Sequence, residues 1–279
     1  MAQLTSLDQL KAHWSEGRFL CVGLDPDIDL IPPHIHQGRA TDTIVAFNRA
    51  VVEATSNIVA AYKPNIAFYE RFGPAGISAL QETIATIRDL NPEVVVILDA
   101  KRGDIGNTNR GYVDSTFEYF GVDGTTVNPY LGFEALRPYA DMRDKLMFVL
   151  CRTSNEGAEE FQGLVCNGEP LFLHVARRVS EHWNRDANNF GLVVGATSPE
   201  ELALVRKEVP ELPLLIPGIG AQGGDVASVS RAIRSTGEPN VLINSSRGIL
   251  YAESSAGGMA SAIRKAATEL ADSLASSLS

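Results

Sequence analysis

Short apolar runs of strand length alternate with longer amphipathic stretches along most of the chain. Repeated strand-then-helix units of this kind are typical of a parallel sheet whose strands are joined by helices. The apolar runs lie at residues 19–24, 61–68, 94–100, 124–128, 145–151, 190–196, 212–216 and 240–245. This number of units, with no linker or break in composition, predicts an α/β fold: a single-domain (β/α)8 TIM barrel over residues 1–279.

The amphipathic stretches carry signals for helix ends. Thr-Asp-Thr at 41–43 offers cap residues for the helix after the first strand. The run 197–201, Thr-Ser-Pro-Glu-Glu, offers a cap, a proline for the first turn and acidic residues that the helix dipole favours. Apolar residues recur every three or four positions from Met259 to Leu278, which predicts a closing helix laid against the barrel.

Composition limits the class of partner. Hydrophobic residues make up 44% of the 279 residues and charged residues 21%, so the chain can bury a sizeable core. The formal net charge of -10 argues against a surface that binds nucleic acid or anionic lipid. A small anionic ligand stays compatible with this charge, because a local cluster of Lys and Arg can hold one inside an acidic protein.

The sequence also carries signals about location. The first residues lack a basic stretch followed by an apolar one, and no apolar run approaches the roughly 20 residues that span a bilayer. The three cysteines are widely spaced, which argues against a disulfide framework. We therefore expect a cytoplasmic protein without membrane contact.

A charged segment follows the most apolar strand, in the run VVVILDAKRGDIGNT at 94–108. Asp99 and Lys101 are two residues apart and so project to the same side of a strand, with Asp104 and Thr108 beyond it. Active sites of barrels lie at the carboxyl ends of the strands, where these charges would sit. The simpler alternative is a structural ion pair followed by a helix cap from Asp104 or Asn107.

Two neighbouring strands favour the functional interpretation. Lys63 lies inside the otherwise apolar second strand, and Asp25 directly follows the first strand. A lysine in an apolar strand is costly to bury without a partner, so we expect Lys63 to face the barrel mouth. Three consecutive strands thus bring Asp25, Lys63, Asp99 and Lys101 to one end.

The last two strand ends resemble an anion site. The glycines of 218–223 have the spacing G-x-G-x-x-G, but they follow the seventh strand, whereas a dinucleotide fold carries this pattern on the first. In barrels the loops after strands seven and eight often bind phosphate. Arg247 in the eighth loop adds a bidentate donor, and Gln222 a neutral one. The alternative is that these glycines only permit tight turns.

Other candidate residues lack partners for chemistry in the sequence. His34 and His36 form a His-x-His pair in a proline-rich loop, but we find no spaced third and fourth ligand, so we expect two solvated histidines and no metal. Cys151 and Ser154 follow the fifth strand without a histidine placed to activate either one. Ser154 is the better candidate for a polar contact at the mouth.

Together these motifs resemble the orotidine 5'-phosphate decarboxylase family. LDAKRGDIGNT is similar to its D-x-K-x-x-D-I-x-x-T signature. GLDPD, AYKPN, PGIGAQGGD and SSRG follow in the family's order, so the resemblance covers residues 20 to 250 and is nearest to the longer bacterial-type (type 2) subfamily. Arg102, Gly103 and Gly106 depart from its commonest pattern at non-catalytic loop positions.

The resemblance implies a reaction and its residues. Orotidine 5'-monophosphate would lose carbon dioxide to give UMP, the last step of de novo UMP biosynthesis. Lys101 would donate a proton to C6 of the pyrimidine, and Asp99 would lie beside the substrate carboxylate. Lys63 would bridge Asp99 and the ribose hydroxyls, which Asp25 also contacts, so that Lys63, Asp99, Lys101 and Asp104 form a charge network.

It also implies a homodimer and further contacts. Asp104 and Thr108 would reach across a two-fold interface into the neighbouring site. Ser154 would contact the edge of the pyrimidine, and Pro217 would line its ring. Gln222 and Arg247 would bind the phosphate. No cofactor is implied: decarboxylation leaves negative charge on carbon without an electron sink, so preorganised charge must stabilise it.

Three alternatives stay open. A metal-dependent sugar-phosphate decarboxylase or aldolase shares D-x-K-x-x-D, but a lysine at position 63 would repel a divalent cation. A Schiff-base aldolase would need Lys101 neutral, whereas Asp99 and Asp104 favour its charged form. A barrel that only binds a phosphate ligand would do so without turnover.

Overall fold

Within the residues that the computed structural model describes (4–185, 188–219, 225–234, 238–253 and 258–278), eight parallel strands close into a barrel. Around the barrel the strands follow the order β1-β10-β9-β8-β5-β4-β3-β2. Their bounds are β1 Leu20–Leu24, β2 Ala61–Pro64, β3 Val95–Arg102, β4 Gly124–Val127, β5 Leu146–Arg152, β8 Phe190–Val194, β9 Leu214–Pro217 and β10 Val241–Ser245. The predicted (β/α)8 barrel is confirmed.

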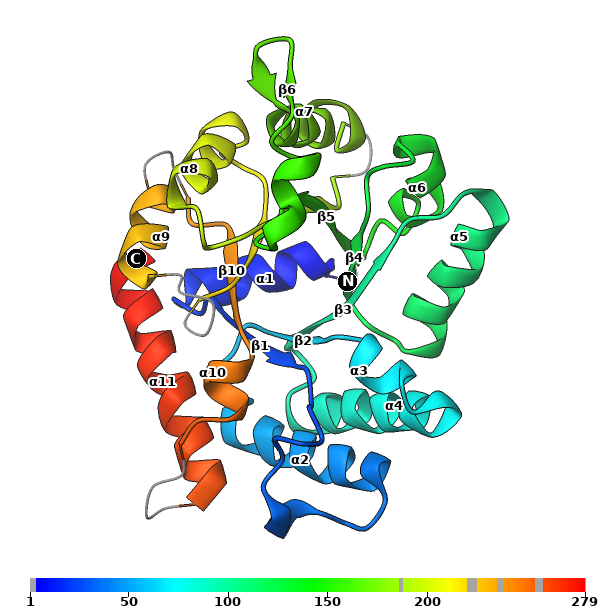
Figure 1. Ribbon diagram of the computed structural model, residues 1–279, viewed down its shortest axis with the longest axis vertical. Coiled ribbons are helices and arrows are strands. Elements are labelled where there is room, and N and C mark those ends of the chain that lie inside the picture. Colours follow the sequence, from blue (N-terminus) through cyan, green and yellow to red (C-terminus); the bar gives the residue numbers. More distant parts are fainter. Residues whose placement is uncertain (1–3, 186–187, 220–224, 235–237, 254–257, 279) are drawn as a thin grey trace.

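Helices surround the barrel as an outer layer (Figure 1). The longer ones are α1 Ser6–Ser15, α2 Ala40–Thr55, α4 Gly73–Leu90, α5 Gly106–Val113, α6 Phe133–Ala140, α7 Leu171–Arg178, α8 Pro199–Glu208, α9 Val226–Arg234 and α11 Gly258–Leu278. Short turns are η1 Pro33–Ile35, α3 Ala67–Glu70, η3 Glu156–Glu160 and α10 Arg247–Leu250, and α5 and α7 continue into the π-helical segments η2 Asp114–Tyr119 and η4 Val179–Trp183. No helix of the described residues is long and apolar enough to cross a membrane.

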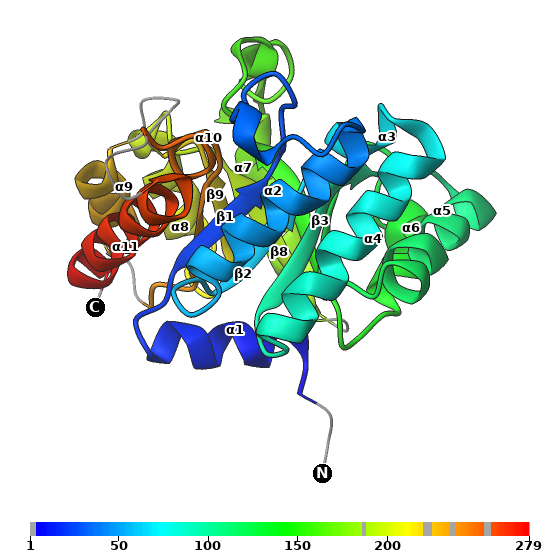
Figure 2. The same cartoon turned by 90° about the horizontal axis from the view of Figure 1, so that it is seen from below.

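Helix α1 covers the amino-terminal end of the barrel, below the strands in Figure 2. Thr5 caps it in a reciprocal capping box with Asp8. The hydroxyl of Ser6 donates to the backbone carbonyls of Asp123 and Asp144, each over 2.8 Å, which fixes the helix to the loops before β4 and β5. The loops at the opposite end are therefore the free ones.

The helix signals were partly correct. Helix α2 begins at Ala40 after Arg39, with no side-chain cap, so the predicted caps at 41–43 are wrong. The Thr43 hydroxyl instead accepts from the Gln37 N–H and donates to the Arg39 carbonyl within the first turn. In α8 the proline and the two acidic residues of the first turn are confirmed, although Ser198 makes no cap bond.

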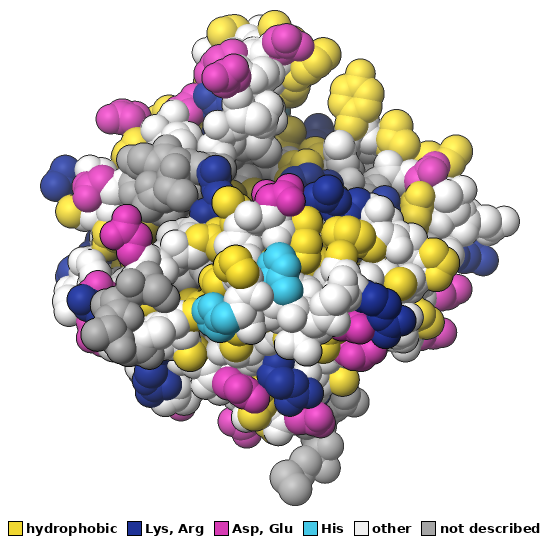
Figure 3. Space-filling model, turned by 60° about the horizontal axis from the view of Figure 1, so that its bottom comes forward, with side chains coloured by type: hydrophobic (Ala, Val, Ile, Leu, Met, Phe, Trp, Pro, Cys, Tyr) yellow, Lys and Arg dark blue, Asp and Glu magenta, His cyan; other side chains and the backbone are white. Residues whose placement is uncertain are grey.

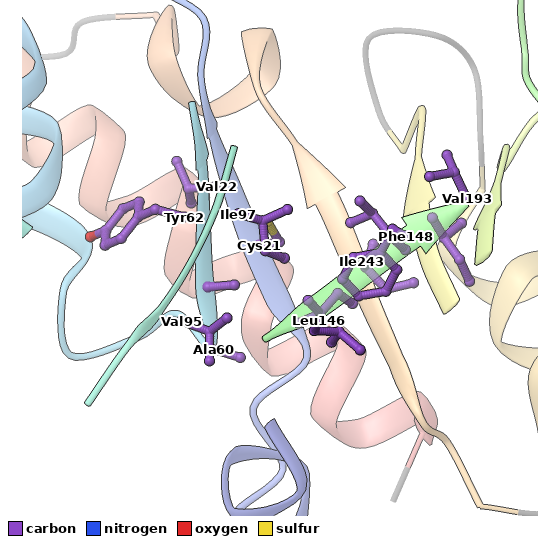
Figure 4. Packing of buried hydrophobic residues seen from close by; sticks show 14 of the residues in the cluster. Cys21, Val22, Ala60, Tyr62, Val95, Ile97, Leu146, Phe148, Val193 and Ile243 are labelled. Carbon is purple, nitrogen blue, oxygen red and sulfur yellow. The ribbon is translucent and has the colours of Figure 1, made fainter. Parts of the chain in front are cut away.

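The barrel interior is filled by alternate residues of the strands. Figure 4 shows Cys21, Phe148 and Ile243 pointing into the space between the strands. All three are fully buried or nearly so. Tyr62 points outward, and its hydroxyl bonds Thr55 of α2 over 2.7 Å. Its neighbour Lys63 must then face inward, because side chains alternate along a strand.

Strand limits near the mouth differ from the predicted ones. The second strand ends at Pro64, not at residue 68, and an isolated bridge beyond it pairs Asn65 with Asp99. Helix α3 follows. The third strand continues to Arg102 through a shift of its register against β4 between Leu98 and Arg102. A strand irregularity thus coincides with the charged segment.

An antiparallel hairpin of β6 Val165–Cys166 and β7 Glu169–Pro170 was not predicted. It follows η3 after β5 and projects from the molecule (Figure 1). Phe161, Leu164 and Val165 are at least half exposed on this projection. Two-residue strands are too short to give a period in the sequence.

Candidate active site

A buried carboxylate is the centre of a charged cluster at the ends of β2 and β3. Oδ2 of Asp99 accepts a hydrogen bond from Lys63 Nζ over 2.8 Å, and Oδ1 accepts one from Lys101 Nζ over 2.7 Å. The side chains of Lys63 and Asp99 are 6% and 9% exposed, whereas that of Lys101 is 50% exposed. The structure thus brings these three predicted residues into contact.

The cluster keeps its charges in spite of burial. Desolvation is the largest influence on Asp99 and opposes its ionisation, but the charges and hydrogen bonds of Lys63 and Lys101 together outweigh it. The pKa of Asp99 therefore lies below its usual range. Desolvation likewise acts to lower the pKa of Lys63, and the carboxylates of Asp99 and Asp25 together reverse this into a net rise.

Lys101 has a left-handed backbone, with a φ of 49°. A residue other than glycine rarely adopts this conformation, which costs free energy unless its surroundings hold it. The hydroxyl of Thr126 on β4 accepts from the N–H groups of Ala100 and Lys101, at 3.1 and 2.9 Å. The same hydroxyl donates to Oδ1 of Asp99 over 2.8 Å. Sequence analysis did not identify Thr126, because threonine is an ordinary strand residue.

A cavity of about 250 Å³ opens beside this cluster. Asp25, Lys63, Asp99, Pro217 and Arg247 line it, as the sequence predicted for one shared site. Figure 3 shows a hollow on the surface in which Lys and Arg side chains gather next to acidic ones. The lining therefore combines carboxylates with the two cations Lys63 and Arg247.

Two further polar residues of this cavity were not predicted. Asn244 at the end of β10 and Tyr251 after α10 both line it. Tyr251 stacks on Phe47 with ring centroids 5.7 Å apart, and its hydroxyl accepts from the Asp27 N–H over 2.6 Å. Asp27 and Tyr251 are 224 positions apart in the sequence, so no local signal connects them.

Two oxygen atoms in the cavity wall are buried without a hydrogen-bond partner among the described residues, Oδ1 of Asp25 and Oδ1 of Asn244. Buried acceptors normally have donors, so each is free to accept a donor from a ligand. Hydroxyl groups of a sugar would supply such donors.

The predicted phosphate loops are described only in part. Gly218 has a φ of 103°, which only glycine adopts easily. This position is therefore compatible both with a glycine that only permits a tight turn and with a phosphate-binding loop. Arg247 is exposed on α10 at the cavity wall. Gln222, Gly220 and Gly223 lie outside the described residues.

Asp104 and Thr108 do not line this cavity. Asp104 accepts from the Ile105 N–H over 2.7 Å, and it takes part in no ion pair within the described residues. Helix α5 has Ile105 at its N-cap without a side-chain cap bond, so the alternative of a cap by Asp104 or Asn107 is wrong. Thr108 is exposed and lines a separate hollow between α3, α4 and α5.

Arg102 points away from the cavity. Its guanidinium pairs with Glu70 over 2.7 Å and lies 4.8 Å from the ring centre of Tyr112. Both partners belong to the outer layer of helices. This departure from the family pattern therefore changes the outer surface next to α3 and α5, and leaves the cavity lining as it is.

Ser154 lies in the loop after β5, outside the lining of the cavity. Gly195 after β8 is so close that a Cβ there would lie 2.9 Å from the Cβ of Ser154. The Thr153 N–H donates to Oε1 of Gln162 over 2.8 Å, and the Arg152 carbonyl accepts from the Gly195 N–H over 2.8 Å. The two residues that precede Ser154 are thus held by hydrogen bonds.

The remaining candidates are structural. Cys151 is buried, and burial raises the pKa of its thiol to about 12, which keeps it protonated. His36 bonds the Ile31 carbonyl over 3.0 Å, and His34 is exposed. No group of three or more His, Cys, Asp or Glu side chains in the described part of the chain could hold a metal ion. The cysteines are free, as expected.

The closed parallel barrel and the lysine–aspartate–lysine cluster at its mouth place the chain in the class of α/β-barrel enzymes. The sequence model of the orotidine 5'-phosphate decarboxylase / HUMPS family matches residues 18–261. The chain belongs to this family.

Relatives and solved structures agree with this assignment. Orotidine 5'-phosphate decarboxylase of Herpetosiphon aurantiacus is 50% identical over 257 residues, 92% of each chain, and that of Thermomicrobium roseum is 50% identical over 258 residues, 91% of this chain and 89% of its own. The structure of Leishmania donovani OMP decarboxylase superimposes with a TM-score of 0.83 at 35% identity and covers 98% of both chains.

Proposed function

We propose that this protein decarboxylates orotidine 5'-monophosphate to UMP and carbon dioxide without a cofactor, as the last step of de novo UMP biosynthesis. The observation that carries the proposal is the Lys63–Asp99–Lys101 cluster at the barrel mouth of a family member. On the strength of its identity to decarboxylases of this name, the protein is a carboxy-lyase.

In the proposed mechanism Lys101 is the proton donor. Loss of carbon dioxide leaves an electron pair on C6 of the pyrimidine, and a proton from the Lys101 ammonium closes the new C–H bond. Two unit charges at ~3 Å and an effective dielectric constant of ~20 attract each other by about 5 kcal/mol. An ammonium that already points at the reacting carbon supplies this stabilisation without reorganisation during the reaction.

Asp99 holds that ammonium in place. Its two oxygens accept from both lysines and from Thr126, so the carboxylate has little freedom to turn. Asp99 is buried and ionised, and it holds the ammonium of Lys101 by a hydrogen bond. Because half of the Lys101 side chain is exposed, a ligand at the barrel mouth can still reach it. The substrate carboxylate would lie next to Asp99 and would leave from there.

The rest of the cavity would bind the parts of the substrate that do not react. The unpartnered oxygens of Asp25 and Asn244 would accept from ribose hydroxyls, and Arg247 with Gln222 would bind the phosphate. Pro217 would line the ring and Ser154 would meet its edge. Binding energy from these remote groups can hold the pyrimidine in its reactive position.

We also propose a homodimer of single-domain subunits in the cytoplasm. Asp104 and Thr108 do not line their own subunit's cavity, which is compatible with a contribution to the partner's site. Ile105 and Tyr119 on the same segment are 61% and 54% exposed. Exposed apolar side chains beside two polar ones are typical of an interface between copies.

Two of the alternatives now have observations against them. A divalent cation would meet the ammonium of Lys63 where it bonds Asp99. A Schiff base on Lys101 would need a neutral amine, whereas its Nζ donates to the carboxylate of Asp99. A barrel that only binds ligand is separated from an enzyme by the test of turnover.

The test is the fall in absorbance as orotidine 5'-monophosphate becomes UMP, in the presence of a chelator, for wild type, Lys101→Ala and Lys11→Ala. Lys11 is an exposed residue of α1 at the other end of the barrel and serves as a control. We expect wild type and Lys11→Ala to turn over and Lys101→Ala to be inactive. A folded wild type without turnover, or one inhibited by chelator, would contradict the proposal.

The dimer has a test of its own. Lys101→Ala and Asp104→Ala are each expected to be inactive, and a mixture of the two, unfolded and refolded together, should regain part of the activity. In a mixed dimer one of the two sites would contain neither substitution. Activity that stays absent in a mixture shown to form mixed dimers would place Asp104 in its own subunit's site.

A further inference from the structure

We infer that Thr126 is a positioning residue that fixes both the backbone and the ammonium of Lys101 for catalysis. The inference deepens the proposed function and rests on it. Thr126 lies on β4, is 2% exposed, and contacts the charged cluster of β3 through its hydroxyl.

The hydroxyl uses its full hydrogen-bonding capacity on one short segment. A hydroxyl has one donor and two acceptor positions. Thr126 accepts from the N–H groups of Ala100 and Lys101 and donates to Oδ1 of Asp99. All three contacts fall between residues 99 and 101, where the register of β3 against β4 shifts.

These contacts replace the strand ladder at the point where it is broken. Between Leu98↔Thr125 and Arg102↔Val127 the two strands have no regular pairing, so the N–H groups of Ala100 and Lys101 need another acceptor. The Thr126 oxygen satisfies both. It thereby holds Lys101 at its φ of 49°, a conformation that the strand alone would not maintain.

The donor side of the same hydroxyl acts on the side chain of Lys101 through Asp99. Oδ1 of Asp99 accepts both from Thr126, over 2.8 Å, and from Lys101 Nζ, over 2.7 Å. Without the Thr126 donor the carboxylate could turn about its terminal bond, and the ammonium would follow it. One hydroxyl therefore fixes where the Lys101 chain begins and where it ends.

Thr125 provides a matched control. It is the preceding residue on β4, is fully buried, and its hydroxyl donates to the Leu98 carbonyl over 2.8 Å. Thr→Val removes one buried hydroxyl at nearly constant shape in both cases, but only Thr126 contacts the charged cluster.

The experiment compares kcat, KM and UMP binding of wild type, Thr126→Val, Thr126→Ser and Thr125→Val, each checked for folding by circular dichroism. We expect kcat of Thr126→Val to fall on the order of 100-fold, as misplacement of a reacting group does. KM and UMP affinity should change little, since the substrate-binding residues remain. Thr126→Ser keeps the hydroxyl and should restore most of kcat, and Thr125→Val should resemble wild type.

Several outcomes would overturn the inference. Equal kcat in Thr126→Val and Thr125→Val, or no recovery in Thr126→Ser, would reduce Thr126 to a structural residue. If Thr126→Val does not fold, Thr126→Cys takes its place, because a thiol is a weak donor and acceptor, and wild-type kcat in that variant would contradict the inference. Turnover by wild type would uphold the proposed function in each of these cases. A folded but inactive wild type would contradict both the proposed function and the inference about Thr126.

Discussion

Asp99 and Lys101 form an ion pair that is buried at one end and open at the other, with side-chain exposures of 9% and 50% over a 2.7 Å contact. Lys101 has a left-handed backbone within the last residues of β3, and its Nζ bonds the carboxylate two residues earlier. The pair is thus anchored in the barrel core while its ammonium faces the mouth.

The two lysines that bond Asp99 should differ in what they support. Lys63→Met would leave Asp99 buried without the buried ammonium that bonds it, and should destabilise the fold by about 3 kcal/mol. Lys101→Met should cost less than about 1 kcal/mol, because half of that side chain is in water, yet it should abolish decarboxylation. Urea unfolding and an activity assay measure the two effects. Equal losses of stability in both variants would contradict this division.

The low pKa of Asp99 predicts how stability depends on pH. A carboxylate whose pKa is lowered by folding contributes stability that is fully present above its unfolded pKa of about 3.9 and is lost as the pH falls toward the folded value. The difference in free energy of unfolding between wild type and Asp99→Asn should therefore be constant near neutral pH and shrink below about pH 4. Urea titrations at a series of pH values measure it, and a difference that is unchanged in acid would show that the ionised form of Asp99 is not what stabilises the fold.

Much of the site could be predicted from the sequence because it lies at strand ends. Asp25, Lys63 and Asp99 each lie near the carboxyl end of an apolar strand, and parallel strands bring these ends together in any register. Thr126 could not be found in this way. Its contact with Asp99 depends on the register shift between β3 and β4, which has no signature in the sequence.

The limits of the elements were harder to predict than their number. Most residues of the run at 61–68 are apolar, but the strand ends at Pro64 and the following residues turn into α3. The caps at 41–43 are wrong because cap residues are equally suited to the first turn, where the Thr43 hydroxyl donates to the Arg39 carbonyl. Asp104 could be placed on the segment after β3, whereas its proposed contribution to a partner's site would depend on an interface outside this chain.

The loop that carries Ser154 should depend on Arg152. This side chain is 10% exposed and pairs with Glu201 of α8 over 2.8 Å and with Glu159 of η3 over 2.5 Å. Arg152→Met would leave Glu201 half-buried without its partner and release η3, so we expect a loss of about 2 kcal/mol and a raised KM. Arg39→Met, which breaks an exposed pair with Asp42, is the control and should change neither quantity. An unchanged KM in Arg152→Met would show that η3 does not support the site.

The close approach of β1 to the end of β10 gives a final prediction, which concerns the binding of the ligand phosphate. A Cβ at Gly23 would lie 1.9 Å from Oγ and 2.9 Å from Cβ of Ser246, so Gly23→Ala must displace Ser246 and the adjacent Arg247. We expect weaker UMP binding, measured by calorimetry, with the barrel still folded because the clash is confined to the mouth.

Removal of the Ser246 side chain relieves that clash, so the double variant Gly23→Ala/Ser246→Gly should recover binding, while Ser246→Gly alone should bind UMP nearly as wild type does. Recovery in the double variant would show that the distance between β1 and the loop after β10 sets the position of Arg247. If the double variant binds as weakly as Gly23→Ala, the added methyl group acts elsewhere, and its nearest other neighbour is Oδ2 of Asp25 at 3.2 Å.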